Sequence, residues 1–174
     1  GGGKLAGEAL VKALGGKGKI AIISHPEVES GMQRTKGFKE VISKTPGMQI
    51  VAELAGKGER DTSYKVAQDI LQSHPDLVGI FAINDPSALG TVAAIEKAGK
   101  QGKIKVIGFD GMKEARQAVK DGKIYADVVE HPDEIGKLTV QALHKHMSGD
   151  KVPPTTLIPA TIYTKEDADK DTAL

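Results

Sequence analysis

Polar residues follow a series of short apolar runs, and their side chains could together bind a small ligand. The positions are His25, Glu53 or the loop Gly56–Arg60, Asn84, Asp110 and Glu130. Carboxylates accept hydrogen bonds, whereas an amide both donates and accepts them, so this set suits a molecule with several hydroxyl groups. Within the loop, Glu59 and Arg60 offer a further acceptor and further donors. These residue types predict a binding site for a small polar ligand.

The same residues also have a purely structural interpretation. Asn84-Asp85-Pro86 and Asp110-Gly111 are typical turn and helix-cap sequences, because short polar side chains bond to nearby backbone groups. Taken singly, each residue is explained by that local role. Their coincidence after several successive apolar runs favours a shared site.

Residue types that carry out catalysis or bind metals do not form a recognisable group. Of the five histidines, His144 and His146 are two apart, which places them on different faces of a helix. There is no cysteine and no Gly-x-Ser-x-Gly sequence. Gly15–Lys19 is rich in glycine but precedes an apolar run, whereas a phosphate-binding loop follows a strand. We predict that the protein is not an enzyme and needs no metal and no cofactor.

Apolar runs alternate along the chain with segments of helical periodicity. The runs predict strands at residues 19–24, 49–55, 79–83, 104–109, 124–129 and 161–163. The helical spacing predicts helices at residues 4–14, 31–44, 61–73, 85–98, 112–120 and 134–147. This alternation predicts an α/β fold, with an open, mostly parallel sheet flanked by helices. Ligands of such sheets bind outside the carboxyl ends of the strands, where the polar residues stand.

Composition narrows the classes of partner. The 174 residues carry 24 basic and 23 acidic side chains, and the lysines do not gather in a run. Only 3% of the residues are aromatic, and there is no tryptophan. Neither a basic surface for nucleic acid nor an aromatic platform for bases is therefore expected. No apolar run is long enough for a membrane span.

Several short motifs occur in an order that resembles the ribose-type periplasmic sugar-binding proteins of ABC importers, which have the type I periplasmic binding protein fold. The motifs are residues 14–23, Arg34–Phe38, Gly79–Asp85, Ala88–Gly90, Val106–Gly111, Asp121–Lys123 and His131–Gly136. The likeness extends from about Gly3 to Tyr163, nearly the whole chain. It implies a non-catalytic protein that binds a monosaccharide or a similar small polyol. It also implies a membrane permease as partner and a periplasmic or extracellular location.

The resemblance implies roles for four side chains. Arg34 matches the family arginine that reaches the sugar ring and hydroxyl groups. Asn84 matches the asparagine that hydrogen-bonds to hydroxyl groups, and Asp110 matches the aspartate that accepts hydrogen bonds from them. Glu130 stands where ribose binders often have glutamine. Gly58 stands where the family often has an aromatic residue, so one stacking surface is absent.

The resemblance also implies that this chain is the C-terminal lobe of a two-lobe protein. Residues 1–174 would form a single α/β lobe, and residues 131–149 a helix that packs on the missing N-terminal lobe. Residues 155–164 would return as a strand, and the charged tail 165–174 is expected to be frayed. A helix left without its lobe exposes apolar surface, so we expect self-association of this piece.

Two other functions remain open on the sequence. The effector-binding domains of LacI-type transcription regulators share the same scaffold, and a DNA-binding segment encoded upstream would favour that alternative. An enzyme on a flavodoxin-like scaffold is less favoured, because we cannot assemble a nucleophile or a metal cluster from these residues.

Overall fold

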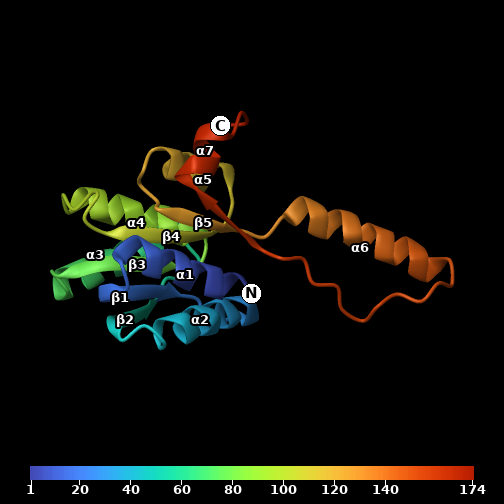
Figure 1. The fold of residues 1–174 in the computed structure, drawn as a ribbon, viewed down its shortest axis with the longest axis horizontal. Helices are drawn as coiled ribbons and strands as arrows, with labels where there is room; N and C mark the ends of the chain where they lie inside the picture. The colour runs from blue at the N-terminus through green and yellow to red at the C-terminus, as the bar shows by residue number, and fades with distance from the viewer.

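A computed structural model describes residues 1–174 and contains one six-stranded sheet (Figure 1). The strands lie in the order β2-β1-β3-β4-β5-β6; β1 to β5 are parallel, and β6 runs antiparallel to β5. The sheet confirms the predicted fold class. The strands are β1 (Lys17–Ser24), β2 (Gly47–Ala55), β3 (Leu77–Ala82), β4 (Lys105–Asp110), β5 (Ala126–Val129) and β6 (Thr161–Thr164).

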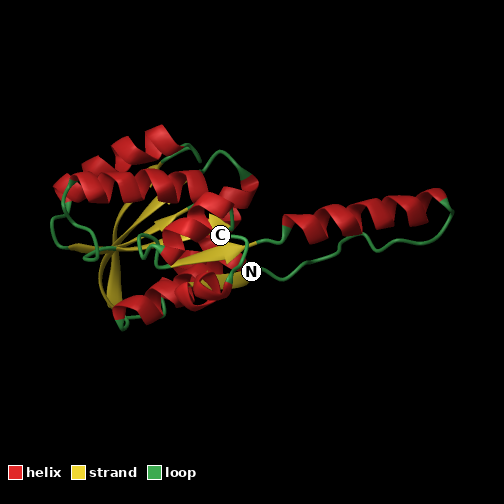
Figure 2. Cartoon of the chain, turned by 90° about the horizontal axis from the view of Figure 1, so that it is seen from above, coloured by secondary structure: helices red, strands yellow, loops and turns green.

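Helices cover both faces of the sheet (Figures 1 and 2). Helices α1 and α2 contribute to the core on one face, and α3, α4, α5 and α7 to the core on the other. Helix α6 lies apart from both layers. The helices are α1 (Gly2–Leu14), α2 (Glu29–Ile42), α3 (Arg60–Ser73), α4 (Asp85–Lys97), α5 (Lys113–Lys120), α6 (Pro132–Met147) and α7 (Lys165–Lys170).

The continuous apolar runs explain the two cores. In β1, Ile20 and Ile22 point to the α1–α2 side, whereas Ala21 and Ile23 point to the opposite side, and all four are fully buried. Alternate side chains of a strand face opposite sides of the sheet, so a strand covered on both faces must be apolar throughout. The central strands are therefore held from both sides.

Two glycines let α1 pack closely on α2, the helix that carries Arg34. A Cβ atom on Gly3 would lie 2.1 Å from the backbone oxygen of Arg34, and one on Gly7 would lie 2.8 Å from Cβ of Val41. Both distances are shorter than real Cβ contacts allow. The small residues thus bring the helices together and fix the height of Arg34 above the sheet.

The chain after Thr164 differs from the expected frayed tail. Residues 165–170 form α7, and Ala168 is fully buried against the core of the α4 side. A reciprocal capping box between Thr164 and Asp167 starts the helix. The charged composition does not reveal these contacts, which also include hydrogen bonds from Lys165 to the Lys120 carbonyl oxygen and from Tyr163 to Asp171. Within the returning segment, residues 161–164 form a strand, in agreement with the strand predicted at residues 161–163.

Helix α6 extends away from the sheet and is joined to it by two extended segments (Figures 1 and 2). None of its residues is buried, and Val140, Leu143 and Met147 are exposed apolar side chains. No helix is both long and apolar enough to cross a membrane.

Candidate ligand-binding site

Arg34 projects from α2 over the carboxyl ends of the central strands. Its guanidinium group lies 3.9 Å from the centre of the Phe109 ring, and its Nη1 donates to the carbonyl oxygen of Ile83 at 2.9 Å. The side chain is only 14% exposed. A planar cation that stacks on an aromatic ring and bonds to a backbone carbonyl is held in one orientation.

The same guanidinium group joins two carboxylates from neighbouring strands. Nη1 lies 3.0 Å from Oδ1 of Asp110, at the end of β4, and Nη2 lies 2.9 Å from Oε2 of Glu130, directly after β5. Both carboxylates are partly exposed. Each therefore has an oxygen that can accept a hydrogen bond from outside the cluster. The arrangement presents acceptors that are already oriented toward the open edge of the sheet.

Burial raises the pKa of Asp110 above its ordinary value, and the nearby Glu130 carboxylate raises it further. The Arg34 guanidinium acts against both effects by favouring the ionised form. The backbone of Asp110 has a φ of 122°, and that of Gly111 has a φ of 86°. A residue other than glycine rarely adopts the first value, so the turn holds Asp110 in a strained conformation.

Asn84 has a structural role at the predicted position. Its Oδ1 accepts the backbone N–H of Ser87 at 3.1 Å and caps α4, as the turn interpretation predicts. Its Nδ2 donates to the carbonyl oxygen of Gly58 at 3.1 Å. One amide hydrogen remains for another partner. Asn84 thus serves as a cap and can still donate to a ligand.

His25 and Asn84 lie beside the loop that contains Gly58. A Cβ atom on Gly58 would lie 3.0 Å from Nδ1 of His25 and 3.1 Å from Nδ2 of Asn84, and the glycine has a φ of 69°. An aromatic residue would be strained at this backbone conformation, and its Cβ would crowd both neighbours. The loop as folded here has little room for an aromatic side chain at position 58.

The remaining predicted residues of the loop make local contacts. Glu59 accepts a hydrogen bond from the Thr62 hydroxyl at 2.8 Å, and Arg60 forms an exposed ion pair with Glu114 at 2.8 Å. These contacts occupy Glu59 and Arg60 outside the Arg34 cluster.

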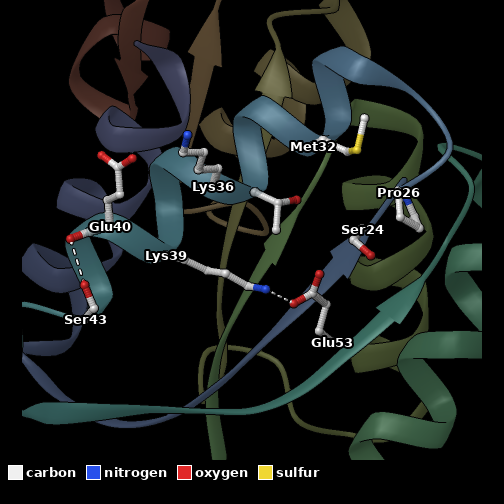
Figure 3. Close-up of a pocket in the computed structure, with 9 residues that line it drawn as sticks. Ser24, Pro26, Met32, Lys36, Lys39, Glu40, Ser43 and Glu53 are labelled. Atoms are coloured by element: carbon white, nitrogen blue, oxygen red, sulfur yellow. Dashed lines mark hydrogen bonds and ion pairs between the residues drawn. The ribbon is translucent and has the colours of Figure 1, made fainter.

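Glu53 lines a separate polar groove between α2 and the strands β1 and β2 (Figure 3). It forms an ion pair with Lys39 across this groove, and Ser24 lies beside it. The groove encloses about 470 Å³. Glu53 therefore does not join the Arg34 cluster, and of the loop only Gly58 contacts a predicted site residue, through the hydrogen bond from Asn84.

The four main predicted side chains lie at one edge of the sheet. Arg34 contacts both Asp110 and Glu130. Asn84 follows Ile83, the residue whose carbonyl oxygen Arg34 binds. The structure thus brings these residues together, while their role toward a ligand stays a prediction.

Two features of the site escaped the sequence interpretation. Phe109 supports the guanidinium group, whereas the sequence pattern indicates only that it belongs to a strand. Asp127 is fully buried in β5 and lies against Asp85. The sequence does contain a signal for Asp127, because this aspartate stands between Ala126 and Val128 in an otherwise apolar strand. Its partner, however, is visible only in the fold.

The chain is similar in sequence to known proteins. The family model for the periplasmic binding protein domain matches residues 1–151. The chain is 34% identical over 166 residues to the ribose import binding protein of Bacillus subtilis, covering 95% of this chain and 53% of that protein. It is 35% identical over 173 residues to the D-apiose import binding protein of Paraburkholderia graminis, covering 97% of this chain and 55% of that protein.

Solved structures give the same result. A periplasmic solute binding protein of an ABC transporter from Actinobacillus succinogenes, with bound D-allose, superposes with a TM-score of 0.95 at 32% identity, over 98% of this chain and 60% of that one. A solute binding protein from Bacillus halodurans with bound myo-inositol has a TM-score of 0.91 at 28% identity, over 97% of this chain and 58% of that one.

The chain spans about half the length of the curated relatives that it matches. Within that span, both the sequence likeness and the fold likeness are nearly complete. The chain therefore belongs to the periplasmic binding protein domain family, a family of non-enzymatic solute-binding proteins.

Proposed function

We propose that this chain is the lobe of a solute-binding protein that binds a monosaccharide or a similar small polyol for an ABC importer. The observation that carries the proposal is the Arg34 cluster, in which one guanidinium group orients the carboxylates of Asp110 and Glu130. The names of similar proteins support the ligand class, since they describe ribose, D-apiose, D-allose and myo-inositol as ligands or cargo.

The cluster suits hydroxyl groups for a chemical reason. Each sugar hydroxyl donates one hydrogen bond and accepts others. Asp110 and Glu130 accept, Asn84 has a free amide hydrogen, and Arg34 donates from a fixed fork. Because Arg34 covers the Phe109 ring, this lobe recognises its ligand through hydrogen bonds and not through an open aromatic face.

A second lobe would complete the site. Helix α6 has no buried residue, and the chain covers about half of its relatives' length. We propose that α6 packs on a second lobe of the same polypeptide, which closes over the ligand from the opposite side. Closure excludes water and strengthens each hydrogen bond to the hydroxyl groups. The proposed partners of this chain are the second lobe and a membrane permease. The proposed location of the chain is the periplasm or the outside of the cell.

Titration calorimetry on the complete polypeptide tests the proposal with a panel of pentoses, hexoses and inositols. We expect saturable binding of at least one compound and loss of that binding in the variant Asp110→Ala. The matched control is Asp69→Asn, an exposed position on α3 outside the cluster. A protein that binds none of these compounds, or one whose Asp110→Ala variant binds as tightly as before, would contradict the proposed function.

A further inference from the structure

Two fully buried carboxyl groups lie directly beneath the Asp110 turn. Asp85 is the first residue of α4 and Asp127 lies in β5, and neither is exposed to solvent. Each carboxyl group shifts the pKa of the other, so the two side chains lie within interaction range. A Cβ atom on Gly108 would stand 3.0 Å from Oδ1 of Asp85 and 3.1 Å from Oδ1 of Asp127, so the glycine gives the two carboxyl groups their space.

The contact between these groups requires a proton. Oδ1 of Asp85 and both oxygens of Asp127 have no donor in hydrogen-bond geometry, and the backbone N–H of Val128 favours ionised Asp127 less than burial and the charge of Asp85 oppose it. Two buried carboxylates in contact also repel one another. Burial, followed by the charge of Asp85, raises the pKa of Asp127 to about 9, and burial raises the pKa of Asp85 to about 6. Between these values the pair holds one proton, and Asp127 is the group that donates it.

Asp85 uses its negative charge to hold the turn that carries Asp110. Its Oδ2 accepts the backbone N–H of Met112 at 2.6 Å, and the backbone N–H of Gly111 also stabilises its ionised form. These two residues directly follow Asp110, whose φ of 122° needs outside support. The backbone N–H of Asp85 in turn favours the ionised form of Asp110. Asp85, at the start of α4, and the turn of Asp110, at the end of β4, therefore stabilise each other.

The other charged groups near the pair come from three elements. Asp110, at the end of β4, raises the pKa of both carboxyl groups. On β6, Tyr163 is the partner of Asp127 in the strand register, and its hydroxyl donates to Asp171 at 2.8 Å. Arg116 of α5 lies over the Tyr163 ring, 5.1 Å from its centre. Arg116 also forms an ion pair with Asp171 at 3.8 Å. No cation is among the main influences on the pKa of Asp127, so we assign the neutralisation of the pair to the proton of Asp127.

We propose that Asp127 is a positioning residue for the ligand site. Its proton orients Asp85 toward the backbone of residues 111–112, and that bond holds Asp110 as a fixed acceptor for ligand hydroxyl groups. The inference rests on the proposed function, because it assigns Asp110 to the ligand. At alkaline pH, loss of the proton places like charges in contact, displaces Asp85 and releases the turn.

Ligand affinity measured between about pH 6 and pH 10 tests this assignment in the complete protein, using the compound that binds best from the panel. We expect wild-type affinity to fall on the alkaline side. The variant Asp127→Asn keeps a donor that cannot titrate, so it should bind normally at pH 7 and lose the alkaline fall. The variant Asp127→Val should bind at least about tenfold more weakly, because it leaves a buried acceptor unpaired. The exposed control Asp69→Asn should follow the wild-type profile.

A second measurement needs no ligand, so it separates this inference from the proposed function. In a chain labelled at the aspartate carboxyl carbons, NMR should show one fully buried aspartate still protonated at pH 7, and Asp127→Asn should remove that signal. The amide of Met112 should resist hydrogen exchange in wild type and in Asp127→Asn, but not in Asp127→Val. Ionisation of every aspartate at pH 7, or an equal alkaline fall of affinity in Asp127→Asn, would overturn the assignment.

Discussion

At the scale of single residues, Arg34 acts through its shape as well as its charge. The guanidinium plane covers the Phe109 ring while its two ends contact carboxylates on different strands. A lysine has the same charge, but its single ammonium group cannot replace that planar fork. The exchange of these two residues therefore separates geometry from charge.

We predict that Arg34→Lys lowers ligand affinity by roughly tenfold to a hundredfold, corresponding to about 1.5–3 kcal/mol for a lost hydrogen bond to a charged group. Calorimetry on the complete protein measures the change. The matched control is the reverse exchange Lys65→Arg, which conserves charge at an exposed position of α3. Equal affinities of Arg34→Lys and wild type would show that the fork does not position the acceptors.

The Asp85–Asp127 pair also predicts how stability depends on pH. Both carboxyl groups have a raised pKa in the folded chain and an ordinary value near 3.8 when unfolded. The folded state therefore holds protons that the unfolded state has lost, and stability falls as pH rises. The window runs from the ordinary value to about 6 for Asp85 and to about 9 for Asp127.

We expect denaturant unfolding to show this fall between about pH 4 and pH 9, with a slope of up to about 1.4 kcal/mol per pH unit for each proton. Asp127→Asn should flatten the profile and stabilise the chain at pH 8, because the amide needs no proton to bond Asp85. Stability that is constant or rises over this range in wild type would contradict the pair's shared proton.

At the scale of elements, α4 begins at the site that it helps to build. Asn84 caps this helix through Ser87 and also bonds to the loop at Gly58. Helix initiation and site geometry therefore depend on the same side chain, through two different atoms. A substitution that preserves one function and removes the other can separate them.

We predict that Asn84→Ala destabilises the chain by about 1 kcal/mol through loss of the cap. Asn84→Ser, which supplies a hydroxyl cap, should recover most of that stability. It should not recover ligand affinity, because serine has no amide group and its shorter side chain cannot place a donor where the Asn84 amide stands. Thermal unfolding and calorimetry on both variants check the two expectations. Full recovery of affinity by serine would show that the amide contributes only the cap.

At the scale of the whole molecule, α6 is the part whose packing is incomplete. Ile135, Leu138 and Ala142 face a hollow that the returning segment also lines, whereas Val140, Leu143 and Met147 are exposed. Exposed apolar side chains at helical spacing on a helix without buried residues are typical of a surface that packs on a partner. In the complete protein we assign that partner to the second lobe.

For the 174-residue chain alone, we therefore predict concentration-dependent self-association, with sugar binding much weaker than that of the complete protein. Sedimentation over a range of concentrations measures the first property, and calorimetry measures the second. The double variant Val140→Glu and Leu143→Glu should shift the chain toward monomer, whereas Gln141→Glu on the same helix should not. A strict monomer with full-strength sugar binding would contradict both expectations.

The sequence by itself determined the alternation of strands and helices and the edge of the sheet at which polar residues gather. Ile20 to Ile23 are all apolar because a strand between two helical layers has no solvent face, and that pattern is visible without coordinates. Asn84 was visible as a helix cap for a similar reason, since capping depends on residues only three apart. Local spacing encodes local structure.

Only the tertiary structure decided which distant side chains touch. Arg34 and Glu130 are separated by 96 positions and meet because α1 and α2 pack closely over the strand ends. Asp127 is conspicuous within an apolar strand, but its partner Asp85 begins a helix that follows a different strand. Likewise, a buried alanine, a capping box and the hydrogen bond from Tyr163 to Asp171 order a tail whose composition predicts fraying. Contacts between segments depend on burial and on the path of the chain in space, which residue spacing does not specify.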